Sequence, residues 1–173
     1  MLKNRKKTFC LLITIFIVLL SGCNGMGKAV DHYFLSLQGE SQTWELSGYE
    51  MVITPKDFKA GNGVLKTKNK GEFLSNFFQF ETHIIIDGED LTVHSGSVSF
   101  SGLNEEEGLD ISNEMTGAIE GESYLNKNGN PISFKEISDI YVIVEWSDMK
   151  KGEYTKEKIE LYSRTNQEPS FLN

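Results

Sequence analysis

From residue 31 onward, the chain consists of short stretches of alternating apolar and polar residues separated by clusters of Gly, Pro, Asn and Asp. Tyr33, Leu35 and Leu37 show this alternation, because a period of two places all three on one face of a strand. The segment 105–114 contains few apolar residues and lacks the spacing of an amphipathic helix. The pattern therefore predicts an all-β domain. The expected strands are 32–37, 44–48, 49–54, 73–86, 91–100, 115–125, 137–146 and 156–163.

Turn signals place the breaks between these strands. Pro55-Lys56-Asp57 and Gly61-Asn62-Gly63 are expected to interrupt the chain, and the segment 126–131 is expected to form a turn. Strands at this spacing favour a single antiparallel β-sandwich of the immunoglobulin-like type over a small barrel. We expect this sandwich to span residues 31–165 and to be followed by a C-terminal tail, 166–173.

The charge balance excludes one class of partner. The chain of 173 residues has a formal charge of −8 and a pI of about 4.9. Nucleic-acid binding requires clustered Lys and Arg, so we expect no nucleic-acid partner. The length is sufficient for a core that needs no metal or disulfide.

The first 23 residues divide into a cationic start, an apolar run and a short motif. Phe9 to Leu20 form an apolar run of 12 residues interrupted only by Thr14. Such a run is too short to span a bilayer but is typical of the hydrophobic region of a secretory signal peptide. Leu20-Ser21-Gly22-Cys23 follows, with small residues before a cysteine. This stretch resembles the lipobox of bacterial lipoproteins.

The lipobox resemblance implies cleavage between Gly22 and Cys23, with acyl chains such as palmitate attached through diacylglycerol on the Cys23 sulfur. Residues 1–22 would then be a lipoprotein signal peptide, and 23–30 a lipidated tether on the extracytoplasmic face of the cell membrane. Removing residues 1–22 would take four of the 17 basic residues and none of the 25 acidic ones. The mature chain would then have 13 basic residues and a charge of −12. Anionic lipid would repel this domain, so the acyl chains must hold it.

A second resemblance lies in the body of the chain. Gly39-Glu40-Ser41-Gln42-Thr43-Trp44 is similar to a Gly-Glu-Ser-x-x-Trp segment of small lipoproteins from Gram-positive, Bacillus-type bacteria. Val144-Glu145-Trp146 and Lys158-Ile159-Glu160-Leu161 are similar to later strands of those chains. The resemblance implies a surface β-sandwich without an established activity, in which Glu40 and Ser41 form a polar turn that positions Trp44. We expect Trp44 and Trp146 to lie in the core rather than to stack on sugars.

Two histidines suggest a metal site. If Ile86 pairs with Leu91 in a β-hairpin, His83 lies opposite His94, with Cβ atoms about 4.5–5.5 Å apart. Two imidazoles at that distance could share Zn²⁺ or Cu²⁺, and Glu81 could supply a third ligand. The alternative is a solvated polar face opposite an apolar core.

Other motifs are weaker. Calcium could bind the acidic loops, but their spacing does not match an EF-hand and favours solvated charge. Ser147-Asp148-Met149-Lys150 matches the Ser-x-x-Lys pair of penicillin-interacting enzymes, but it follows a predicted strand and lacks the partner motifs, which favours a turn. The acidic loops contain Asp87, Glu89, Asp90, Glu105, Glu106, Glu107 and Asp110.

These observations favour a non-enzymatic, lipid-anchored lipoprotein that needs no cofactor and binds a protein or envelope polymer not specified by the sequence. One alternative is a metal-binding surface protein that uses His83, His94 and Glu81. A second alternative is a hydrolase of envelope polymer that uses paired carboxylates.

Overall fold

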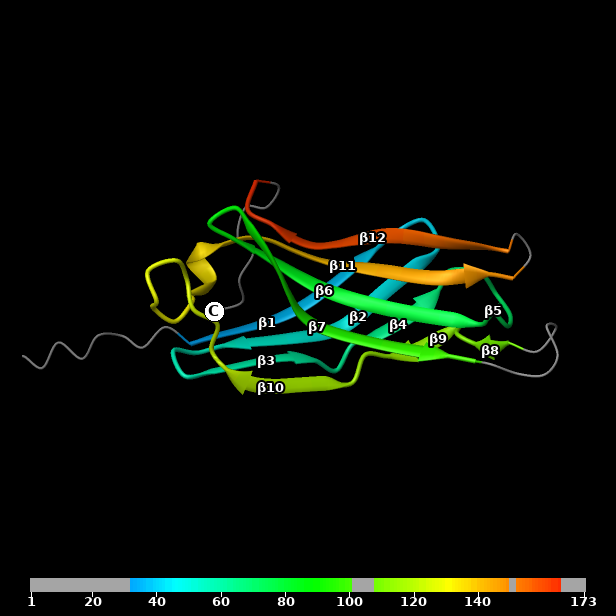
Figure 1. Cartoon of the computed structure of the whole chain (residues 1–173), viewed down its shortest axis with the longest axis horizontal. Coiled ribbons are helices and arrows are strands. Elements are labelled where there is room, and N and C mark those ends of the chain that lie inside the picture. Colours follow the sequence, from blue (N-terminus) through cyan, green and yellow to red (C-terminus); the bar gives the residue numbers. More distant parts are fainter. Residues whose placement is uncertain (1–31, 101–107, 150–151, 166–173) are drawn as a thin grey trace, which may run out of the picture. The chain divides into compact units, whose positions relative to one another are not determined.

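The computed structural model of the chain describes residues 32–100, 108–149 and 152–165. Figure 1 shows the arrangement of its strands. The strands are β1 (Tyr33–Glu40), β2 (Trp44–Ile53), β3 (Asp57–Gly61), β4 (Val64–Thr67), β5 (Leu74–Ser75), β6 (Phe77–Ile86), β7 (Glu89–Ser99), β8 (Leu109–Asp110), β9 (Asn113–Met115), β10 (Ala118–Glu122), β11 (Ile137–Asp148) and β12 (Glu153–Ser163). A single 3₁₀ turn, η1 (Phe134–Glu136), begins at a Ser133 capping box.

Two antiparallel sheets contain most of these strands. In the first sheet, β2 pairs with β1 along one side and with β3 and β4 along the other, and β10 and β9 extend the sheet beyond them. The second sheet has the order β12-β11-β6-β7, and β5 and β8 form a short third pair. Figure 1 shows the second sheet crossing over the first. The predictions of an all-β fold and of an antiparallel sandwich are confirmed.

Both expected chain breaks are present, although the first ends one residue earlier than expected. The turn at 54–56 exists, but Asp57 already belongs to β3, and β4 begins directly after Gly63. The register with β2 is the same on both sides of this point, because Glu50 faces Gly61 and Ser47 faces Val64. The expected break at Gly61-Asn62-Gly63 is therefore present as a bend at 62–63, and β3 and β4 on either side of it keep one register with β2.

A line of left-handed residues crosses the first sheet at this bend. Gly48 lies in β2, Asn62 between β3 and β4, and Gly117 between β9 and β10, with φ values of 65°, 62° and 65°. The Asn62 amide donates to the Gly117 carbonyl at 2.6 Å, so the strands stay bonded through the bend. Left-handed backbone favours Gly and Asn. In β2 the inward set changes from Trp44 and Leu46 to the residues at 49, 51 and 53, so the bend reverses which alternate residues face the core.

The core lies between the two sheets. Inward residues of β2, β6, β11 and β12 form one apolar cluster. Trp44 and Trp146 are buried and meet edge to face, with ring centroids 5.6 Å apart. Their predicted place in the core is confirmed.

The Gly39–Trp44 segment joins the two sheets. The Ser41 Oγ accepts the Trp44 amide at 3.2 Å and donates to the Glu157 carboxylate of β12 at 2.6 Å. Thr43 also donates to Glu157, through its amide at 2.9 Å and its hydroxyl at 2.7 Å. The expected polar turn is present at Ser41, whereas Glu40 is the last residue of β1 and pairs with Lys68 at 2.8 Å. Glu157 links this turn to the second sheet.

Candidate functional site

A group of four interacting titratable side chains lies on the outer face of the second sheet. Strand alternation turns the inward residues of β6 and β11 toward the core and their neighbours outward. The register places His83 of β6 directly beside Tyr141 of β11. Asp90 comes from the start of β7 and Lys158 from β12, so four adjacent strands contribute to one cluster. We call His83, Asp90, Tyr141 and Lys158 the His83 cluster.

The geometry of the His83 cluster is tight. The imidazole of His83 stacks on the ring of Tyr141, with centroids 4.8 Å apart and an interplanar angle of 1°. The Lys158 ammonium lies 4.3 Å from the same ring centroid. Asp90 accepts the Tyr141 hydroxyl with one carboxylate oxygen and lies 2.9 Å from His83 Nδ1 with the other. Both oxygens of Asp90 are therefore occupied within the cluster.

Electrostatics fix the charge states of two members. Burial, together with the hydrogen bond to Asp90, raises the pKa of Tyr141 to about 12. Burial acts to raise the pKa of Asp90, but hydrogen bonds from Tyr141 and His83 outweigh it and lower that pKa. At neutral pH, Asp90 is ionised and Tyr141 is a neutral donor.

One nitrogen of His83 remains without a hydrogen bond. Its Nε2 is buried and lies 3.6 Å from the Glu81 carboxylate, and Gln79 donates to the other oxygen of Glu81 at 2.9 Å. The His83 ring therefore lies between the carboxylates of Glu81 and Asp90. The cluster contains one hydroxyl, that of Tyr141, which donates to Asp90, and no serine, threonine or cysteine side chain that could act as a nucleophile.

The predicted pairing of His83 with His94 is wrong. The hairpin turns tightly at Asp87 and Gly88, so that Ile86 faces Glu89 rather than Leu91. His83 consequently faces Thr92. A β-bulge after this pair then turns His94 toward the core, opposite Thr82.

His94 is part of a buried polar contact between the sheets. Its Nδ1 lies 2.8 Å from the Tyr49 hydroxyl, and its ring packs edge to face on Phe80. Burial lowers the pKa of His94, against a hydrogen bond with the main chain of Thr116, and burial also raises the pKa of Tyr49. The two histidines face opposite sides of the sheet. They therefore cannot bind one metal ion together, as the sequence-based hypothesis required. No group of three or more His, Cys, Asp or Glu in the described ranges could hold a metal ion.

The acidic loops have structural partners where the structure describes them. The Asp110 carboxylate accepts the amides of Phe73 at 3.0 Å and Ser112 at 2.9 Å, and these bonds lower its pKa. Glu89 forms an ion pair with Lys127 at 3.5 Å. Residues 105–107 lie outside the described part.

Ser147 has a structural environment as well. It lies in β11 rather than in a turn, and its hydroxyl is 2.9 Å from the hydroxyl of Ser75. Lys150, the second residue of the Ser-x-x-Lys match, lies outside the described residues.

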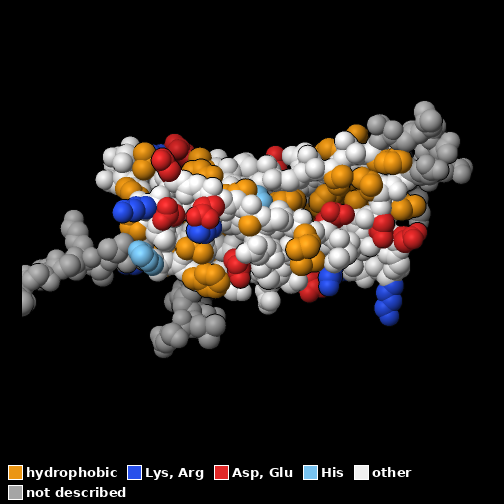
Figure 2. Space-filling model, turned by 90° about the horizontal axis from the view of Figure 1, so that it is seen from below, with side chains coloured by type: hydrophobic (Ala, Val, Ile, Leu, Met, Phe, Trp, Pro, Cys, Tyr) orange, Lys and Arg blue, Asp and Glu red, His pale blue; other side chains and the backbone are white. Residues whose placement is uncertain are grey.

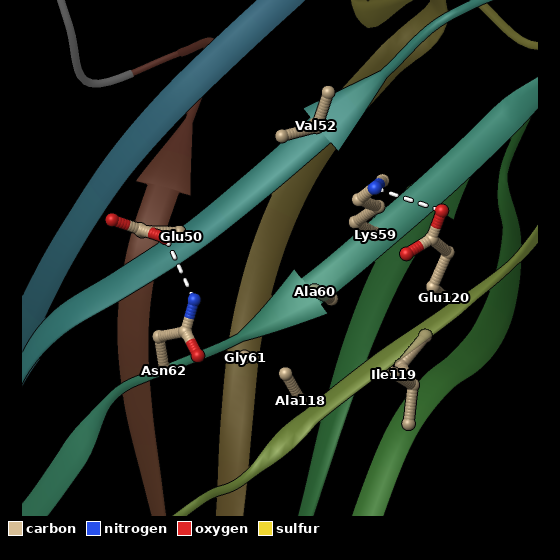
Figure 3. Close-up of a pocket in the computed structure, with 9 residues that line it drawn as sticks. All are labelled: Glu50, Val52, Lys59, Ala60, Gly61, Asn62, Ala118, Ile119 and Glu120. Atoms are coloured by element: carbon tan, nitrogen blue, oxygen red, sulfur yellow. Dashed lines mark hydrogen bonds and ion pairs between the residues drawn. The ribbon is translucent and has the colours of Figure 1, made fainter.

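A shallow hollow of about 310 Å³ lies on the outer face of the first sheet. Figure 3 shows two pairs across it, Asn62 donating to Glu50 at 2.8 Å and Lys59 paired with Glu120 at 2.7 Å. Its polar side chains bond one another and converge on no common point. In Figure 2, hydrophobic side chains gather instead toward the end where Figure 1 shows β5, β8 and β9.

The predicted signal peptide, the lipidation site Cys23 with Gly22, the tether and the C-terminal tail lie outside the described residues. In the parts of the chain that are described, no helix is both long and apolar enough to cross a membrane. No protein-family model, no curated protein and no solved structure matches the chain.

Sequence reasoning found His83 and Glu81 but missed Asp90, Tyr141 and Lys158 as their partners. Asp-Gly between two alternating runs is a strong signal for a two-residue hairpin turn, and it would have placed Asp90 near His83. The approach of Tyr141 depends on how β11 pairs with β6 across a long sequence separation, and no local pattern specifies that pairing.

Proposed function

We propose that the chain is a lipoprotein anchored by acyl chains on Cys23 at the extracytoplasmic face of the cell membrane, with its β-sandwich acting as a non-enzymatic binding module. One observation carries the anchoring proposal. A cationic start, an apolar run of 12 residues and Leu20-Ser21-Gly22-Cys23 follow one another in the order that lipoprotein processing requires.

The composition of the domain is compatible with this location. The two cysteines of the chain are Cys10 and Cys23, so the sandwich contains none and does not depend on a disulfide. Its stability comes from apolar burial between the sheets. Two acyl chains give stable membrane attachment without help from basic residues, which suits an acidic domain.

The proposal is tested by the intact mass of the protein extracted from membranes of the producing cell. We expect a mass equal to residues 23–173 plus diacylglycerol, and a full-length, unlipidated chain for Cys23→Ala. Cys10→Ala makes the same change inside the apolar run and should be processed like the wild type. An uncut wild-type chain, or one cut elsewhere without lipid, would refute the anchoring proposal.

The non-enzymatic part needs its own test. Purified protein that hydrolysed a cell-wall or ester substrate, and lost that activity in a carboxylate or serine variant, would overturn it. We expect no turnover by the wild type or by Asp90→Asn, which alters the most completely bonded carboxylate of the His83 cluster.

A further inference from the structure

The edges of the two sheets differ in how they are protected. In the described part of the chain, β1 and β12 lie against each other: Gly39 meets the main chain of Glu160, and Glu157 accepts from Ser41 and Thr43. On the far side of the first sheet, β9 and β10 contain three acidic residues. These are Glu114, Glu120 and Glu122. Charged side chains commonly prevent a free strand edge from pairing with a strand of another chain.

The free edge of β7 has no such protection over its second half. β7 ends the second sheet, with β6 on its one bonded side. From Leu91 to Asn104 the sequence contains no Asp, Glu, Lys, Arg or Pro, which makes this the longest uncharged run after the predicted tether. The bulge at Val93 lies before the segment Ser95–Ser99, which remains regular. An uncharged, regular edge is a template for another strand.

The hydrogen-bond pattern shows which groups face outward. The Phe100 amide donates to the Asn76 carbonyl at 2.9 Å, and the same register pairs Val98 with Phe78. In an antiparallel ladder, every second residue of a strand forms hydrogen bonds with a given neighbour. Phe100, Val98 and every second residue before them therefore bond β6. The backbone N–H and C=O groups of the intervening residues, Ser95, Ser97 and Ser99, therefore point away from β6, toward the open edge.

We propose that the segment Ser95–Ser99 pairs antiparallel with the same segment of a second copy, joining two second sheets into one. Pairing centred on Ser97 sets Ser95 of one copy opposite Ser99 of the other and brings their free backbone groups together. Hydroxyl side chains then face hydroxyl side chains across the new ladder. Val98 of one copy faces Gly96 of the other, and the ring of Phe80 covers the Cα of that glycine.

The absence of charged residues favours this segment for contact between identical chains. Two copies without residues 1–22 have a formal charge of −12 each and repel, and a self-contact is tolerated best where the contact itself contains no charge. Five residues per copy bury much less than a standard interface, so the pair is weak, with a dissociation constant on the order of 100 µM. Salt screens the repulsion and strengthens the pair.

The experiment uses the chain from residue 24 onward, without lipid. Residues 31–173 form a compact unit of their own that contains all the buried core residues among those the structure describes, so this chain keeps the folded domain intact. Sedimentation velocity is measured up to about 1 mM protein, at low salt and at about 0.5 M NaCl. We expect a concentration-dependent monomer–dimer equilibrium that shifts toward dimer at the higher salt. Because no lipid is present, the result does not depend on the anchoring proposal.

Variants at Ser97 separate pairing from folding. Ser97→Pro removes an N–H that faces the open edge, a position where strands tolerate proline, and should weaken the dimer at least about tenfold. Ser97→Glu places a charge at the centre of the contact and should do the same. Ser36→Glu makes the identical change at an exposed position of β1 and should dimerise like the wild type.

A cross-link tests the register. Ser97→Cys introduces a lone cysteine into this chain, and directly opposed residues of antiparallel strands lie within disulfide range. We expect a disulfide-linked dimer under mild oxidation, and much less from Ser36→Cys. A wild-type chain that stays monomeric under every condition, or Ser97→Pro and Ser97→Glu variants that dimerise like the wild type, would overturn the proposal.

Discussion

Replacing Tyr49 with Phe removes one hydroxyl from the interior of the sandwich and changes almost nothing else. Tyr49 is fully buried, and its hydroxyl lies 2.8 Å from Nδ1 of His94, which is itself 5% exposed. With the ring proton on Nε2, the Tyr49 hydroxyl donates to Nδ1. Phe fits the same space but leaves this acceptor without a partner and out of reach of water.

The size of the effect follows from these contacts. A net hydrogen bond contributes about 1 kcal/mol, and a buried acceptor left unsatisfied costs about 1–3 kcal/mol. Burying Phe instead of a phenol recovers part of this, because the Tyr49 hydroxyl no longer has to leave water. We therefore expect Tyr49→Phe to lower the free energy of unfolding by about 2 kcal/mol. With an ordinary denaturant slope, the urea midpoint falls by about 1 M.

Urea unfolding at about pH 8 measures this change, because His94 is neutral there. Tyr154→Phe is the matched control, since its side chain is 68% exposed and its loss should change the free energy by less than about 0.5 kcal/mol. Adding His94→Leu to Tyr49→Phe removes both polar partners and should cost less than the sum of the single changes. A Tyr49→Phe protein as stable as the wild type, with additive effects in the double variant, would refute the reasoning.

Three further predictions concern stability. Burial lowers the pKa of His94, so the unfolded chain takes up a proton that the folded one does not. The free energy of unfolding should therefore fall as pH drops below about 6.5, and fall less in His94→Asn, as measured by urea unfolding across pH. Gly39→Ala places a Cβ into the Glu160 carbonyl and 2.8 Å from Cγ2 of Ile159, and thermal unfolding should show a loss of about 1–3 kcal/mol. Burial acts to raise the pKa of Glu157, but hydrogen bonds from Ser41 and Thr43 lower it, so its contribution disappears as pH falls through and below its usual range. Glu157→Gln should cost about 1 kcal/mol in urea unfolding at neutral pH and little in acid.

The sequence was informative where one local pattern determined the structure. Tyr33, Leu35 and Leu37 alternate without interruption, and the strand that contains them faces the core as expected. The tryptophans were placed correctly because large apolar residues at strand centres have few alternatives to burial. The polar turn before Trp44 was also predictable, since Ser41 in such a turn can accept a main-chain amide.

The sequence was misleading where a backbone irregularity changed the alternation. The break at Gly61-Asn62-Gly63 was expected, but the sequence did not show that β3 and β4 keep one register with β2 across it. The bulge at Val93 shifts the register by one residue and moves His94 from the surface to the core. Such shifts depend on what the neighbouring strands and the core can accommodate. A single chain without tertiary information does not reveal them.

The bend at Gly48, Asn62 and Gly117 has a consequence for how this fold can vary. After a one-residue deletion in β2 near Gly48, the residues beyond it would continue the alternation that begins at Trp44 and Leu46. The neighbouring segments at Asn62 and Gly117 would still change which alternate residues face the core. Apolar side chains of β2 would then point to solvent on one side of the bend. Length changes at these three positions should therefore be tolerated only in concert, and any natural variants of this chain should gain or lose the three left-handed residues together.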